Sequence, residues 1–97
     1  MKLLWSSSAR DDLISIRHFI AEHNPTAAKA VSARLVYAAN LLCDRPQLGL
    51  RTHRDDIRRL IVGNSVYSLI YRIRDGNIEI IEVFDGRQSA SRTDLVP

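Results

Sequence analysis

Cysteine and long apolar runs are what this 97-residue sequence has least of. Cys43 is the only cysteine, so no internal disulfide can form, and this agrees with a reducing compartment. No apolar run approaches the roughly 18–20 residues that span a bilayer. The short apolar run after Lys2 does not resemble a signal peptide. We therefore expect a cytoplasmic protein that has no membrane partner.

Motifs that mark cofactor and metal sites are also missing. The sequence contains no Gly-rich phosphate loop, no zinc-ligand spacing and no Gly-x-Ser-x-Gly elbow. His18 and His23 would lie on different faces of one helix, so they do not form a metal pair. No acidic pair stands out as a general acid and base, and Cys43 is expected to be a structural thiol. The sequence thus predicts no metal, no cofactor and no confident catalytic residue.

Arginine, in contrast, is plentiful in a chain whose formal net charge is +3. The planar fork of arginine suits carboxylate and phosphate groups. Six arginines lie on or beside the expected strands: Arg58, Arg59, Arg72, Arg74, Arg87 and Arg92. They are either solvated strand ends or a set that binds an anionic partner, such as nucleic acid or an acidic protein segment.

Three apolar runs rich in β-branched and aromatic residues predict strands at Leu60–Val62, Val66–Ile73 and Ile78–Phe84. The breaks between them, Gly63–Ser65 and Arg74–Asn77, contain residues that tolerate positive φ. Both breaks are too short for a crossover helix, so neighbouring strands must run antiparallel. The sequence therefore predicts an antiparallel meander.

The period of two in a strand separates the faces of this meander. In the middle strand, Tyr67 and Tyr71 share one face. In the last strand, the same rule places Ile80 with Phe84 and opposite Val83. Neither strand alternates cleanly, so both faces are partly apolar. We expect helices on one face and a partner, or part of the chain, on the other.

The first half of the chain predicts a short strand and a helix. Met1–Trp5 is apolar and too short for a helix, so it is expected to join the sheet. Ser8 and Asp11 resemble a capping box at a helix start. Apolar residues then recur at helical spacing until near His23, at Ala9, Leu13, Ile16 and Ile20.

A second helix is predicted directly after the first. Asn24 is a good N-cap, and Pro25 suits the first helical position. The second apolar stripe runs to about Cys43 through Ala28, Val31, Leu35, Ala38 and Leu42. The short turn implies an antiparallel helix pair, and both helices must dock on the sheet because neither would be stable alone.

Residues 1–97 are therefore expected to form one α+β domain. It consists of a short N-terminal strand and an antiparallel two-helix hairpin, packed on an antiparallel sheet of three to four strands. The polar stretch Asp44–Asp56 is expected to be a loop, and Gly86–Pro97 a polar end that is poorly ordered at its tip. These patterns by themselves indicate only a domain that binds an anionic partner.

An ordered set of segments carries a resemblance to a known family. It comprises the Asn24–Ala28 turn, the Pro46–Gly49 loop, and the segments Arg59–Val62, Tyr67–Arg72 and Ile80–Gln88. Over nearly the whole chain, this set resembles the toxins of the ParE/RelE superfamily of bacterial type II toxin–antitoxin modules. The resemblance implies a cognate ParD- or RelB-like antitoxin that wraps and neutralises the toxin. It also implies that the complex binds operator DNA through the antitoxin.

The superfamily has two activities. RelE-like members cleave ribosome-bound mRNA without metal, using an arginine after the middle-strand tyrosine, a second after the last strand, and a C-terminal tyrosine or histidine. Here Ser68 follows Tyr67, Arg87 matches the second arginine, and Thr93 falls near the third position. ParE-like members instead poison DNA gyrase by binding, and the Asn-Pro-x-Ala-Ala turn resembles that branch.

The resemblance therefore implies a gyrase-binding toxin rather than an enzyme. One alternative is a ribosome-dependent mRNA endonuclease in which Arg87 is catalytic, and another is a non-toxic interaction module. Gly86 lets the backbone turn, so Arg87 should project from the end of the sheet, with Asp85 close enough to orient its guanidinium. The candidates for target binding are Arg87, Arg72, Arg92, Arg59 and Arg58. The candidates for antitoxin binding are Leu13, Ile16, Ile20, Val31, Leu35 and Tyr67.

Overall fold

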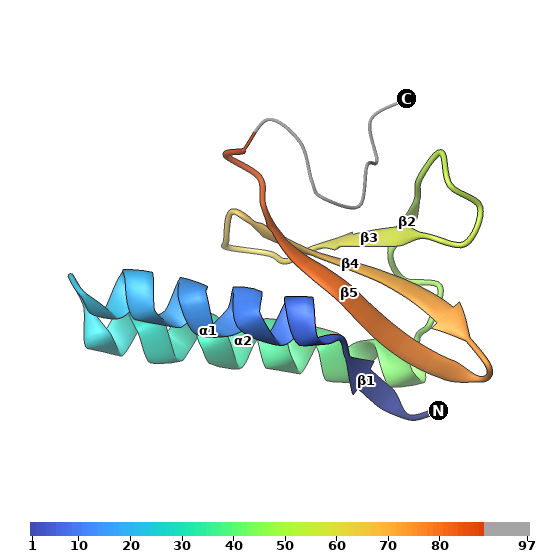
Figure 1. Ribbon diagram of the computed structural model, residues 1–97, viewed down its shortest axis with the longest axis horizontal. Coiled ribbons are helices and arrows are strands. Elements are labelled where there is room, and N and C mark those ends of the chain that lie inside the picture. The colour runs from blue at the N-terminus through green and yellow to red at the C-terminus, as the bar shows by residue number, and fades with distance from the viewer. Residues whose placement is uncertain (89–97) are drawn as a thin grey trace.

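The computed structural model describes residues 1–88 and places two helices against one face of a five-stranded sheet (Figure 1). In chain order the elements are β1 (Leu3–Trp5), α1 (Ser7–Ala21), α2 (Pro25–Asp44), β2 (Leu50–Arg51), β3 (Arg58–Ile61), β4 (Tyr67–Arg74) and β5 (Asn77–Asp85). The strand order across the sheet is β1-β5-β4-β3-β2. Strand β1 runs parallel to β5, and all other neighbours are antiparallel. The predicted α+β class, N-terminal strand, helical hairpin and meander are confirmed.

The sheet has one strand more than the sequence predicts. The extra strand, β2, lies inside the polar stretch that reads as a loop, and it pairs Leu50 with Arg59 and Arg51 with Arg58. Two residues are too few to show an alternating pattern, so only the pairing with β3 reveals this strand.

The two helices differ in how well their starts follow from local sequence. Asn24 caps α2 as predicted, because its side chain accepts a hydrogen bond from the Ala27 N–H at 3.0 Å and Pro25 occupies the first turn. For α1 the predicted capping box at Ser8 is wrong. The cap is Ser6, whose backbone is extended, whereas Ser8 already lies within the helix.

A long-range contact explains why Ser6 is the cap. Its hydroxyl accepts a hydrogen bond from the Ala9 N–H at 3.0 Å and donates one to the Ile81 carbonyl at 3.0 Å. The cap therefore ties the start of α1 to β5, a contact between residues that are distant in the sequence. Caps of this kind are worth about 1 kcal/mol.

The β4–β5 hairpin has the tight turn that its sequence predicts. Arg74 pairs with Asn77, which leaves Asp75 and Gly76 as a two-residue loop. Their φ values are 54° and 73°, as a type I′ turn requires. Asn64, in the turn before β4, also has a positive φ of 57°. These turns fix the register of the meander.

A β-bulge in β5 overturns the predicted division of that strand into faces. Ile70 pairs with Glu82, but the next residue, Tyr71, pairs with Ile80, so Ile81 is the extra residue. Beyond the bulge the alternation is inverted. Val83 therefore packs with Ile80 under the helices, whereas Phe84 lies in the small cluster on the opposite face. A strict period of two cannot anticipate this inversion.

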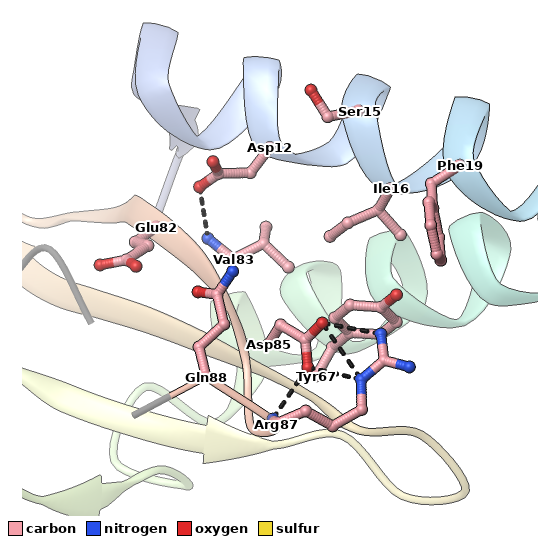
Figure 2. A pocket seen from close by; sticks show the side chains of 10 residues that line it. All are labelled: Asp12, Ser15, Ile16, Phe19, Tyr67, Glu82, Val83, Asp85, Arg87 and Gln88. Carbon is pink, nitrogen blue, oxygen red and sulfur yellow. Dashed lines mark hydrogen bonds and ion pairs between the residues drawn. The ribbon is translucent and has the colours of Figure 1, made fainter. Parts of the chain in front are cut away.

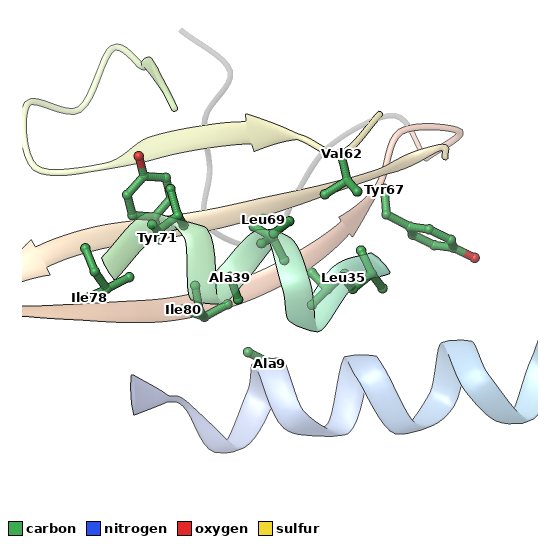
Figure 3. Close-up of a cluster of buried hydrophobic side chains, with 12 residues drawn as sticks. Ala9, Leu35, Ala39, Val62, Tyr67, Leu69, Tyr71, Ile78 and Ile80 are labelled. Carbon is green, nitrogen blue, oxygen red and sulfur yellow. The ribbon is translucent and has the colours of Figure 1, made fainter. Parts of the chain in front are cut away.

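The main core lies between the helices and the sheet (Figure 3). Ala9, Leu35 and Ala39 from the helices meet Leu69 and Ile80 from the strands. The predicted helical stripes are confirmed as the core faces, and alanine on each helix lets the helices approach closely. A smaller cluster of Ile57, Ile70 and Phe84, with Ile81 beside it, lies on the other face of the sheet. Within residues 1–88, no helix is both long enough and apolar enough to cross a membrane.

Candidate target-binding cleft

A cleft of about 300 Å³ opens where α1 passes the C-terminal end of β5. Figure 2 shows its lining: Asp12, Ser15, Ile16, Phe19, Tyr67, Glu82, Val83, Asp85, Arg87 and Gln88. Helix α1 supplies one wall, β5 with the residues just after it supplies another, and the first residue of β4 lies between them. The cleft thus joins the first helix to the last two strands, which are far from that helix in the sequence.

Helix α1 is held over this cleft by a carboxylate. Asp12 accepts a hydrogen bond at 3.0 Å from the backbone N–H of Val83. Within residues 1–88, no strand pairs with β5 beyond Ile80 on the β1 side, because the register of β1 ends at Trp5. Asp12 therefore satisfies a backbone donor at that open edge and fixes the distance between the helix and the strand.

An ion pair fixes Arg87, the one cationic side chain among the described residues that line the cleft. Arg87 Nη2 lies 2.7 Å from Asp85 Oδ2, and Arg87 Nε lies 3.0 Å from Asp85 Oδ1. The Arg87 backbone N–H donates to Asp85 Oδ1 at 2.9 Å as well. The Arg87 side chain is nevertheless 58% exposed. Asp85 thus orients the guanidinium as predicted, while more than half of the Arg87 side chain stays accessible to a further acceptor.

The protonation of this pair is set by its own contacts. The hydrogen bonds from Arg87 hold the pKa of Asp85 below its usual range, and they outweigh the burial that would raise it. The same contacts raise the pKa of Arg87 further. Burial, followed by the Asp85 charge, raises the pKa of Tyr67, although the Arg87 guanidinium opposes this. At neutral pH the cleft therefore presents a fixed ion pair beside a neutral phenol.

An aromatic side chain flanks the ion pair on α1. Phe19 lines the cleft, is 57% exposed, and meets His23 edge to face with a centroid distance of 6.4 Å. The combination of an open arginine fork and an apolar wall can bind an anionic or carbonyl group that lies next to an apolar one. Phe19 is absent from the sequence-based candidates because it lies off the apolar stripe of its helix.

The other arginines named for target binding do not gather at this cleft. Arg72 is bound to Glu79 at 2.8 Å on a neighbouring strand. Arg59 donates to Ser68 Oγ at 3.0 Å and lies over the Phe84 ring.

Arg58 is also engaged within the chain. It donates to the Gly49 carbonyl at 2.9 Å and so holds the segment that leads into β2. Arg92 lies outside the described residues. Among the described arginines named for target binding, Arg87 is therefore the one whose position suits it to an external ligand.

The residues predicted to bind the antitoxin differ in how deeply they are buried. Leu13, Ile16, Ile20 and Val31 pack partly against the core. Leu35 is 0% exposed and Tyr67 is 5% exposed. In this conformation Leu35 offers no surface to a partner, so its helical stripe indicates a core position instead.

A groove between the outer faces of the helices includes only one of the residues predicted to bind the antitoxin, Leu13. It has a volume of about 400 Å³ and is lined by Leu13, Ile14, Arg17, Lys29, Ser32, Ala33 and Val36. Ile14 and Val36 are exposed apolar residues that lie outside the two predicted core stripes. Their position outside the stripes is the sequence feature that could have indicated this groove. Within residues 1–88, no group of histidine, cysteine and acidic side chains is placed to hold a metal ion.

Comparisons with known proteins agree with this architecture. Residues 3–90 match the family model described as the ParE toxin of the type II toxin–antitoxin system parDE. A curated relative, "Toxin RelE2" of Caulobacter vibrioides, is 32% identical over 82 residues, which cover 84% of this chain and 91% of that protein. A solved chain of the chromosomal ParDE TA system from P. aeruginosa superposes with a TM-score of 0.77 at 22% identity. That match covers 88% of this chain and 95% of the other.

Proposed function

The chain belongs to the ParE toxin family of type II toxin–antitoxin systems, and from this premise we propose that it inhibits DNA gyrase by binding. The proposed contact is the cleft at the end of β5, with Arg87 as its central residue. The observation that carries the proposal is the guanidinium held by Asp85 at 2.7 Å while more than half of the side chain is exposed. A pre-oriented arginine loses little side-chain entropy when it binds.

Binding rather than RNA cleavage is favoured by the residues around Arg87. Metal-free cleavage of RNA needs groups that activate the 2′-hydroxyl and stabilise the charged phosphorane. Ser68 stands where an arginine would be expected for that chemistry, and its side chain is buried and engaged by Arg59. Burial raises the pKa of Tyr67, so this phenol is not poised to lose a proton near neutral pH. An inhibitor that acts by binding needs no catalytic set.

A cognate antitoxin is the second partner that we propose. The structural neighbour from P. aeruginosa belongs to a ParDE TA system, which supports a partner of this class. The groove between the outer faces of α1 and α2 is apolar and carries Arg17 and Lys29 on its borders. We therefore propose that an amphipathic, acidic helix of a ParD- or RelB-like antitoxin lies there. Operator DNA would be bound through the antitoxin in the same complex.

The gyrase proposal is tested with purified protein freed of antitoxin. It is expected to inhibit DNA supercoiling by gyrase in a dose-dependent way and to leave ribosome-bound mRNA intact. Codon-specific cleavage of mRNA together with normal supercoiling would reverse the assignment. The antitoxin groove is tested separately by hydrogen exchange, in which added antitoxin should increase the protection of residues 9–42.

Ribosome-dependent mRNA cleavage is the second candidate function. It is favoured by the name of the relative from C. vibrioides, "Toxin RelE2", which is 32% identical to this chain. In that case Arg87 would stabilise charge on the phosphate being cleaved. The same pair of assays decides between the two functions, because gyrase inhibition and ribosome-dependent cleavage are measured independently.

A further inference from the structure

The edge of β5 that borders the cleft carries backbone groups that no neighbouring strand binds. Strand β1 pairs with β5 only at residues 78–80, and among residues 1–88 no other strand lies on that side of β5. Farther along, the Ser6 hydroxyl donates to the Ile81 carbonyl. The Asp12 carboxylate accepts from the Val83 N–H. The backbone groups that remain determine what this edge can bind.

The pairing of β5 with β4 shows which way the backbone groups of β5 point. The Val62 N–H donates to the Tyr67 carbonyl at 3.0 Å, so the backbone groups of Tyr67 point toward β3. Because antiparallel pairing alternates, Tyr67 and its partner Asp85 do not exchange backbone hydrogen bonds. The N–H and C=O of Asp85, and those of Val83 two residues earlier, therefore point toward α1. The bond from the Val83 N–H to Asp12 on α1 agrees with this direction.

Two of these four outward groups have partners within the chain. The Val83 N–H donates to Asp12 at 3.0 Å, and the Asp85 carbonyl accepts from the Gln88 N–H at 3.0 Å. Among residues 1–88, no hydrogen bond engages the Val83 carbonyl or the Asp85 N–H. Val83 and Asp85 both line the cleft. One backbone acceptor and one backbone donor, on either side of Phe84, therefore remain open there.

These two open groups match a single residue of a parallel strand. In a parallel pair, a residue donates its N–H to the residue before its neighbour and accepts from the N–H of the residue after that neighbour. A residue opposite Phe84 would thus donate to the Val83 carbonyl and accept from the Asp85 N–H. An antiparallel strand would need both groups of Val83 or both groups of Asp85, and each residue already has one group engaged. The edge therefore favours an added segment that runs parallel to β5, as β1 does.

The same register places the next side chain of the added segment inside the cleft. A residue opposite Asp85 would share its face of the sheet, which is the helix-facing side because its partner Tyr67 packs in the main core. On that side the Arg87 side chain is 58% exposed and Phe19 is 57% exposed. The carboxylates of Asp12 and Asp85 are each held by a donor of this chain. The accessible arginine fork therefore favours a carboxylate at this position of the segment.

We propose that the cleft binds an extended segment of the target protein, which pairs with β5 in parallel through one residue opposite Phe84 and places an acidic side chain at Arg87. The inference rests on the proposed binding of gyrase and specifies the chemistry of that contact. A nucleic-acid phosphate fits less well, because its oxygens can accept from the Asp85 N–H but cannot donate to the Val83 carbonyl. The adjacent acceptor and donor are instead matched by one residue of a peptide backbone.

Hydrogen exchange of the toxin bound to the gyrase holoenzyme tests the backbone contact. The Asp85 amide should exchange at least about tenfold more slowly in the saturated complex, as a new backbone hydrogen bond requires. The Val83 amide already donates to Asp12, so it is the internal control and should slow by less than about threefold. Unchanged exchange of the Asp85 amide in a complex that inhibits supercoiling overturns the added segment and leaves gyrase binding intact. If the toxin neither binds nor inhibits gyrase, the proposed function fails and the inference fails with it. Equal slowing by a short DNA duplex without gyrase would assign the site to phosphate and contradict the proposal.

Two tryptophan variants on α1 test whether the cleft must be open. Ser15 is exposed and lines the cleft, so Ser15→Trp should block the added segment and weaken gyrase inhibition at least about tenfold. Arg10→Trp places the same ring on an exposed α1 residue that does not line the cleft, and it should inhibit within about twofold of the parent. Both variants should melt near the parent, because both positions are exposed. Equal inhibition by the two folded variants contradicts the proposal. If Ser15→Trp does not fold, the exchange of the Asp85 amide in the parent complex decides alone.

Discussion

Tyr67 and Tyr71 lie on the same face of β4, yet their hydroxyls have opposite surroundings. The Tyr71 hydroxyl is enclosed, where it donates to Pro46 and accepts from Gly49. Tyr67 lines an open cleft beside an exposed arginine. At the Tyr71 end, β4 therefore holds the loop between α2 and β2 in place. At the Tyr67 end, it borders a cleft whose charged groups are accessible to a partner. The comparison separates residues that stability requires from residues that are free to serve binding.

The locked end should tolerate even a methyl group poorly. A Cβ added at Gly49 would lie 2.6 Å from Tyr71 Cε1 and 2.7 Å from its hydroxyl oxygen. Gly49→Ala is therefore expected to lower the free energy of unfolding by about 3 kcal/mol, as overpacked positions do. Gly63→Ala is the matched control, because no atom lies within 4 Å of its added Cβ. Denaturant unfolding of both variants measures the difference, and equal stabilities would refute the tight packing at Gly49.

Removing the hydroxyl of Tyr71 or of Tyr67, one at a time, should show how much each end of β4 contributes to stability. Tyr71→Phe leaves the Gly49 N–H and the Pro46 carbonyl without their partner, which should cost about 2 kcal/mol. Tyr67→Phe should cost less, because Tyr67 lines the open cleft and its hydroxyl does not join two backbone groups as that of Tyr71 does. Thermal and denaturant unfolding provide the measurement. A larger loss for Tyr67→Phe would contradict the division of roles between the two ends.

At the open end, the loss of the orienting carboxylate should affect binding more than stability. Asp85→Asn leaves Arg87 in place but frees its guanidinium, which must then be ordered by the target. The concentration needed to inhibit gyrase should rise by about 2- to 10-fold. Asp75→Asn is the matched control, since Asp75 lies 3.9 Å from exposed Arg74 at the distant hairpin. Equal effects of the two variants would show that Asp85 does not position Arg87 for binding.

The smallest effect expected is on the pH dependence of stability. Because the Asp85 pKa is lower in the folded state, the pair stabilises the protein above the pKa of the unfolded carboxyl and loses this contribution as pH falls through the lowered value. The melting temperatures of parent and Asp85→Asn should differ by about 1–3 °C near pH 6, since the pair is partly exposed. That difference should vanish at strongly acidic pH. A difference that grows on acidification would contradict the sign of this shift.

Local patterns were enough to predict much of the fold. The helical stripes, the Asn24 cap and the Asp75–Gly76 turn depend on neighbours in the sequence, and the structure confirms them. The predictions were wrong where contacts between distant segments determine the local structure. The true cap of α1 is chosen by its bond to Ile81, and the bulge at the same residue inverts the faces of β5.

The candidate site was likewise only partly predictable from the sequence. The Asp85–Arg87 pair could be predicted because the two residues are close in the sequence. The walls of the cleft, Asp12 and Phe19, could not, since they lie on a helix that only the folded chain brings to the end of β5. The arginines named on other strands share a residue type with Arg87 but have different surroundings.

The most direct test of the account compares two exposed arginines in a gyrase supercoiling assay. Arg87→Ala should weaken inhibition at least about 30-fold, because a buried charged contact with the target is lost. Its melting temperature should fall by only about 1–3 °C, because the ion pair with Asp85 is partly exposed. Arg74→Ala, which removes an equally exposed arginine beside Asp75, should inhibit like the parent. If folded Arg87→Ala protein inhibits gyrase as strongly as Arg74→Ala does, the cleft at the end of β5 is not the target-binding site.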